Sequence, residues 1–99
     1  MAVFEGAKLD MLYYSGESYI QTPCCVYFVQ SAILVQYEHD DDHFWVGTMQ
    51  GQGHFELELH KTSDTGIFGR ATLHRFEDST ILEGYFEDED SSGLWRICL

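Results

Sequence analysis

The chain has 99 residues, 44% hydrophobic and 15% aromatic, and its 17 acidic and 5 basic residues give a net charge of -12. A chain of this length forms one domain, residues 1–99, which excludes a cleft between two lobes. The aromatic content excludes a disordered acidic tail, because such tails lack apolar surface. The negative charge disfavours direct binding to nucleic acids and to anionic membranes, since both require basic side chains.

The sequence shows no secretion signal and no membrane span. Its first residues lack a basic region followed by an apolar stretch, and no later segment approaches the ~20 apolar residues that cross a bilayer. We therefore expect a soluble cytoplasmic protein. The three cysteines, Cys24, Cys25 and Cys98, form no even framework, so we expect reduced thiols rather than disulfides.

Short runs of Tyr, Phe, Val and Ile separated by polar turns predict antiparallel strands, and no window has a helical period. The clearest run is 54–60, where strict alternation puts Phe55, Leu57 and Leu59 on one face. In chain order the predicted strands are Lys8–Tyr14, Tyr19–Thr22, Cys24–Val29, Ala32–Glu38, Phe44–Met49, His54–His60, Phe68–Phe76, Ile81–Glu87 and Leu94–Leu99. The sequence thus predicts an all-β meander of about eight or nine short strands.

Closing each turn as a hairpin tests these strands, because a slip of one residue would turn every side chain to the other face. The cross-strand pairs predicted in this way are Phe28–Ile33, Tyr37–Trp45, Gly47–Phe55, Leu57–Ala71, Leu73–Gly84 and Phe86–Trp95. One continuous apolar face results, made of Cys24, Val26, Phe28, Ile33, Val35, Tyr37, Trp45, Gly47, Met49, Phe55, Leu57, Leu59, Ala71, Leu73, Leu82, Phe86, Trp95, Ile97 and Leu99. On the other face Arg70 lies between Glu58 and Glu87, and His74 lies beside Glu83.

A meander with one apolar face must either close on itself or stack against another sheet. We therefore expect a small barrel or a half-open sandwich. Gly47, Gly69 and Gly84 favour the barrel, because glycine lets a strand bend sharply.

Two tryptophan motifs suggest a family likeness. Trp45-Val46-Gly47 lies on an inward-facing strand, and Gly93-Leu94-Trp95 opens the last strand. With this meander, the chain resembles the lipocalin-like and avidin-like small up-and-down barrels. Their glycine and tryptophan signature lies near the first strand, so the resemblance concerns architecture alone and transfers no ligand-binding residue. It implies a fold whose mouth can hold a small apolar molecule.

The aromatic residues of the inward face are the candidate ligand-binding residues: Tyr37, Trp45, Phe55, Phe86 and Trp95. They would enclose a small apolar molecule if the barrel is not filled by its own side chains, since about eight strands leave room for one small ligand at most.

Metal-binding candidates are weak. His54 and His74 lie near Glu56, Glu58 and Glu83 on the polar face, but that face is convex. The turn His39–His43 contains two imidazoles and three carboxylates, of which a tight hairpin can converge only a few. Asp88–Gly93 resembles the first half of a calcium loop, but Arg96 and Leu99 occupy the closing positions. We expect no cofactor.

The outer side of the first paired strands is unexpectedly apolar. Tyr27, Leu34, Phe44 and Val46 are neighbours there, although the later strands are charged on that side. This patch predicts either a homodimer or a cover of N-terminal strands carrying Met11, Tyr13 and Ile20.

The sequence favours a non-enzymatic binding module for a small apolar ligand, because an enzyme interior would carry more titratable groups. The first alternative is an acidic interaction or inhibitor module that mimics the charge of a nucleic acid through Asp40–Asp42 and Glu87–Asp90. The second is a weak surface metal site or a metal-assisted enzyme using His54, His74 and Glu56.

Overall fold

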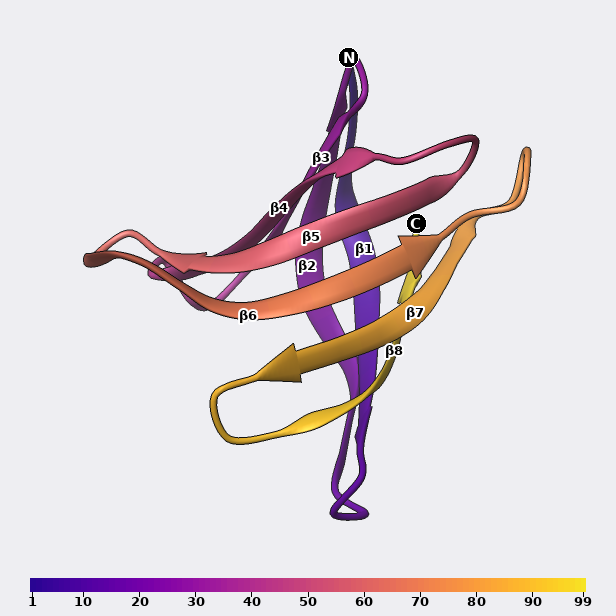
Figure 1. Cartoon of the computed structure of the whole chain (residues 1–99). Helices are drawn as coiled ribbons and strands as arrows, with labels where there is room; N and C mark the ends of the chain where they lie inside the picture. Colours follow the sequence, from indigo (N-terminus) through magenta and orange to yellow (C-terminus); the bar gives the residue numbers. More distant parts are fainter.

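Eight antiparallel strands follow one another around a closed barrel in the computed structural model, which describes residues 1–99 (Figure 1). The strands are β1 (Ala2–Tyr13), β2 (Ser18–Val29), β3 (Ala32–Tyr37), β4 (His43–Met49), β5 (His54–Lys61), β6 (Asp64–His74), β7 (Ile81–Asp88) and β8 (Ser92–Cys98). The all-β meander is confirmed, and closure of β1 onto β8 excludes the half-open sandwich. This up-and-down architecture is the one that lipocalin-like barrels have.

The N-terminal strands differ most from the expectation. β1 begins at Ala2 and not at Lys8, and the two segments expected around Pro23 form the single strand β2. Pro23 pairs with Lys8, and a bulge nearby places Gln21 at a positive φ of 57°. A bulge adds a residue and bends the strand without ending it, which is why the sequence pattern suggested a break here.

Three of the six predicted cross-strand pairs follow the observed register. Phe28 pairs with Ile33 and Leu57 with Ala71, and the pairs on either side place Leu73 opposite Gly84. The other three predictions are wrong by two residues: Val35 pairs with Trp45, Gly47 with Leu57, and Gly84 with Trp95. A shift of two residues leaves every side chain on its predicted face, because strand side chains alternate with a period of two.

The core contains seventeen buried apolar residues and no buried polar or charged residue. Three of them, Ala7, Leu9 and Met11, come from β1, and all the others belong to the predicted inward face. Met49 is the one clear exception on that face, because it is exposed at the end of β4. Met11 therefore fills the barrel, and the prediction that it helps to cover the outer apolar patch is wrong.

The order of the strands separates two kinds of turn. The turns after β1, β3, β5 and β7 lie at one end of the barrel, and those after β2, β4 and β6 lie at the other (Figure 1). The first end carries nine acidic residues in or beside its turns: Glu17, Glu38, Asp40, Asp41, Asp42, Asp64, Asp88, Glu89 and Asp90. We call it the acidic end. The other end is the open mouth described below.

Candidate functional site

The five aromatic residues expected to bind a ligand lie at different depths in the barrel. Trp45, Phe86 and Trp95 are fully buried, with ring centroids 5.1 Å apart for the two tryptophans and 6.3 Å for Phe86 and Trp95. The Trp95 indole N–H donates to the carbonyl of Thr72 at 2.9 Å. These three rings fill the middle of the barrel. Inside the barrel, a ligand can therefore bind only at one of the two ends.

Phe55 reaches a pocket of about 740 Å³ at the end opposite the acidic turns. We call this the mouth pocket; its apolar wall is formed by Phe4, Phe28, Met49, Phe55 and Phe76. The rings of Phe4 and Phe28 meet edge to face, and Phe28 also contacts Phe55 at 5.9 Å between centroids. The ring of Phe76 is 76% exposed on the rim of the pocket. Sequence alternation found Phe28 and Phe55 but missed Phe4, which precedes the first predicted strand, and Phe76, which it places on the outward side of the predicted strand Phe68–Phe76.

Arg75 is the cation of the mouth pocket. Its guanidinium lies over the Phe28 ring, 5.4 Å from the centroid, and its Nε donates to the carbonyl of Ser79 at 2.7 Å. No carboxylate lies within ion-pair distance of it, although Glu77 and Asp78 also line the pocket. The backbone N–H of Arg75 donates to the carbonyl of Gly53, which joins two of the turns around the opening.

Tyr37 lies at the other end of the barrel, beside a smaller pocket of about 340 Å³. Its hydroxyl accepts the Trp45 indole N–H at 2.9 Å. Burial raises the pKa of Tyr37 to about 12, so this hydroxyl stays protonated at neutral pH. Met11, Tyr13 and Tyr19 also line this pocket. This pocket adjoins the acidic end.

His54 and His74 are direct cross-strand partners, and His74 is in turn the partner of Glu83. The two imidazole rings are 6.0 Å apart between centroids and point outward from the barrel. No group of three or more His, Cys, Asp or Glu side chains converges on a common point anywhere in the chain. The predicted proximity is therefore confirmed, without a third ligand to complete a metal site.

The two acidic turns bind their own chain. In the first, the carboxylate of Asp42 accepts from the hydroxyls of Thr62 and Ser63 and from the Ser63 amide, each at 2.9 Å. Asp40 accepts from His43 Nδ1 at 2.8 Å. In the second, Asp88 accepts from the amides of Asp90 and Ser91. The Asp40 and Asp88 bonds close their own hairpins, whereas the Asp42 bonds join the turn after β3 to the turn after β5.

The predicted interface residues lie side by side on the outer face. Tyr27 pairs with Leu34 and Leu34 with Val46, while Phe44 stacks on His60 at 5.7 Å. All four are half-buried by their neighbours. More exposed apolar side chains lie elsewhere, on β8 and the β1–β2 hairpin: Leu12, Tyr14, Ile20 and Leu94. Alternation could not rank these residues, because exposure depends on how far the hairpin extends beyond the barrel.

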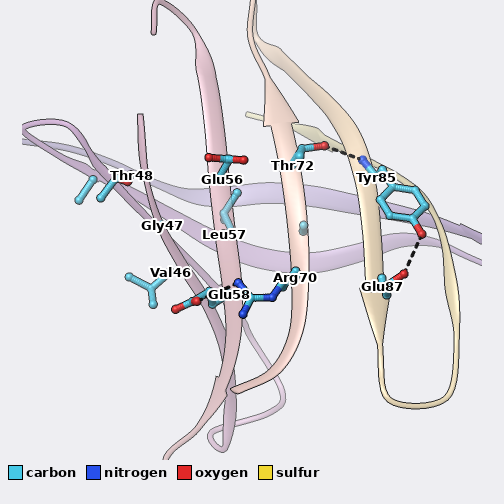
Figure 2. A pocket seen from close by; sticks show the side chains of 12 residues that line it. Val46, Gly47, Thr48, Glu56, Leu57, Glu58, Arg70, Thr72, Tyr85 and Glu87 are labelled. Atoms are coloured by element: carbon cyan, nitrogen blue, oxygen red, sulfur yellow. Dashed lines mark hydrogen bonds and ion pairs between the residues drawn. The ribbon is translucent and has the colours of Figure 1, made fainter. Parts of the chain in front are cut away.

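The outer face also contains an open pocket of about 720 Å³ across β4, β5, β6 and β7 (Figure 2). Glu58, Arg70 and Glu87 form one cross-strand row through it, as predicted, and Arg70 binds Glu58 at 3.2 Å. The Tyr85 hydroxyl donates to Glu87 at 3.1 Å. The adjacent carboxylate of Glu56 makes no hydrogen bond or ion pair.

Comparisons with known protein families, with curated proteins and with solved structures give no match to this chain. Its family is therefore not defined by relatives, and its class is that of a small closed antiparallel barrel. The protein has no helix that is long and apolar enough to cross a membrane.

Proposed function

We propose that the protein is a non-enzymatic binding module that holds a small apolar molecule at its mouth pocket. The observation that carries this proposal is the exposed ring of Phe76 above a wall of Phe28 and Phe55 in an otherwise filled barrel. The volume of about 740 Å³ lies within the range of small-molecule sites. The resemblance to lipocalin-like barrels supports a ligand site at the mouth, because such barrels bind their ligands there.

Arg75 favours a ligand whose apolar body ends in an anionic group. The guanidinium already has a ring beneath it, and only its Nε is used within the chain. An arginine held in this way presents its remaining N–H groups for two parallel hydrogen bonds to a carboxylate. The ligand thus gains apolar contact from the phenylalanines and orientation from Arg75.

The test is titration with decanoate and with decanol, followed by amide chemical shifts. We expect decanoate to shift Gly53, Phe55 and Arg75 and to bind more tightly than decanol. Phe76→Ala should weaken binding about tenfold, the cost of one ring's burial. Tyr14→Ala removes an equally exposed ring from the other end and should leave affinity unchanged. Shifts confined to the acidic end, or equal losses in both variants, would refute the proposal.

A second candidate function is acidic interaction with a basic partner. It is supported by the nine carboxyl groups at the acidic end, including Asp40–Asp42 and part of Glu87–Asp90. Such a surface attracts the basic groups that otherwise contact nucleic-acid phosphates. Binding of oligolysine tests it, because attraction by exposed charges should fall steeply between low and physiological ionic strength. Decanoate binding should change little over the same range.

The remaining expectations stay predictions. A homodimer through Tyr27, Leu34, Phe44 and Val46 is supported by their adjacency in one apolar patch. A cytoplasmic location and the absence of a cofactor rest on the sequence alone. A metal-assisted reaction at His54 and His74 is the least supported function, because no third ligand joins them.

A further inference from the structure

Two adjacent pockets of different character lie on the outer face. The pocket over β4 to β7 and a neighbouring one of about 650 Å³ over β1, β8 and β7 are both lined by Thr72 and Tyr85. Gly47 and Gly84 line the two pockets, one in each. We call the whole depression the outer groove. It is distinct from the mouth pocket, with which it shares no lining residue.

The half of the outer groove over β4 to β7 is acidic. Glu56, Glu58 and Glu87 line it against the single cation Arg70 (Figure 2). Arg70 is bound to Glu58, so Glu56 and Glu87 remain without a cation. Two carboxylates on one exposed face raise the local negative potential and attract a basic side chain.

The half over β1, β8 and β7 is apolar. Leu12, Ile20 and Leu94 line it and are 53%, 71% and 52% exposed. Its one cation is already paired, because Arg96 binds Asp10 at 3.2 Å and Asp10 also accepts the Gln21 amide at 2.8 Å, which leaves Glu83 as the charged residue without an ion pair. Binding in this half therefore comes mainly from apolar contact beside the single carboxylate of Glu83, and an exposed apolar surface of this kind marks an interaction site.

We infer that the outer groove binds a basic amphipathic segment of another protein. Apolar side chains of that segment would contact Leu12 and Leu94, and its Lys or Arg side chains would pair with Glu56 and Glu87. From Glu56 on β5 to Leu12 on β1 the groove crosses five strands, a path of ~19 Å along the barrel surface or about six extended residues. A second copy of this chain is a poor occupant of the groove, because it has a net charge of -12. Its projecting β1–β2 hairpin, residues 13–20, offers no basic side chain, since its one charged residue is Glu17.

The experiment uses a synthetic peptide with leucines in its first half and lysines in its second, and a control peptide in which glutamates replace the lysines. We expect the lysine peptide to bind and the glutamate peptide not to bind. Glu56→Lys with Glu87→Lys should weaken binding at least about tenfold. Glu89→Lys with Asp90→Lys changes the net charge equally outside the groove and should have a much smaller effect.

The apolar half is tested by Leu94→Ser against Ile67→Ser, two leucine-sized side chains of similar exposure, of which only Leu94 lies in the groove. Only the first should weaken binding. Equal losses in the two charge variants would assign the effect to overall charge or to the acidic end and overturn the inference. It would also be overturned if sedimentation showed a dimer that Leu94→Ser dissociates, because a second copy would then occupy the groove.

Discussion

Trp45 donates its indole N–H to the hydroxyl of Tyr37 across strands β3 and β4, at 2.9 Å. The two residues are diagonal neighbours, because the residue directly opposite Trp45 is Val35. This bond satisfies a polar group that would otherwise be buried without a partner.

Tyr37→Phe should destabilise the barrel by about 1–3 kcal/mol, because it leaves the buried Trp45 N–H without an acceptor. Chemical unfolding followed by tryptophan fluorescence measures the loss. Tyr14→Phe, at an exposed tyrosine, is the control and should leave the midpoint unchanged. Equal stability of the two variants would show that water replaces the Tyr37 hydroxyl.

Gly84→Ala should cost about 2–3 kcal/mol of stability through overpacking. A Cβ atom at this position would collide with the backbone carbonyl of Thr72 on β6. Because that strand is hydrogen-bonded on both sides in the closed barrel, its backbone cannot shift without a loss of stability. Gly6→Ala is the matched control, since a Cβ there meets nothing within 4 Å. Thermal unfolding of both variants distinguishes close packing from a general effect of glycine replacement, which would lower both melting temperatures alike.

Asp42 should make stability depend on pH. Hydrogen bonds from the Ser63 amide and hydroxyl and from Thr62 lower the pKa of Asp42 below its ordinary value of 3.8. A lowered pKa stabilises the fold above the unfolded-state value, and this stabilisation is lost as the pH falls through the folded-state value. Asp42→Asn should therefore lower the melting temperature at pH 7 and have a smaller effect near pH 3. Asp41→Asn is the control, because the Asp41 carboxylate makes no hydrogen bond, and it should leave the melting temperature unchanged at both pH values. A loss for Asp42→Asn that does not depend on pH would contradict the assignment.

Cys24 should be unreactive in the folded protein. Burial raises the pKa of the Cys24 thiol to about 12, whereas Cys25 and Cys98 are only half-buried. A variant retaining Cys24 alone, Cys25→Ser with Cys98→Ser, should react with a disulfide reagent at pH 8 only after denaturant is added. The reciprocal variant Cys24→Ala should react without it. Rapid modification of Cys24 in native buffer would mean that the barrel opens at β2.

Dimerisation should respond to the outer apolar patch. Leu34→Asp places a charge among Tyr27, Val46 and Phe44 and should convert a dimer into monomers, as measured by sedimentation velocity. Ile67→Asp makes the same type of change on β6 and should leave the assembly intact. A wild-type monomer at tens of micromolar would exclude the dimer.

Phe28 and Phe55 are residues of the mouth pocket whose positions the sequence pattern predicted. Their inward positions follow from alternation, and both line the mouth pocket. Alternation along 68–76 also places Arg75 inward, whereas it places Phe76 outward, and Phe76 lines the pocket only because β6 ends at His74. The outer groove was not predictable either, since it requires β1 to lie beside β8, at the other end of the chain.

The sequence by itself determined which face of β2 to β8 is buried, because an error of two residues in hairpin length leaves every side chain on the same face of its strand. It also determined the all-β class and the row of Glu58, Arg70 and Glu87. Only the tertiary structure decided that the barrel closes through β1, that the tryptophans fill its centre, and that open pockets remain at the ends and on the outer face. These features depend on contacts between residues far apart in the chain, and a local pattern of polarity carries no information about such distances.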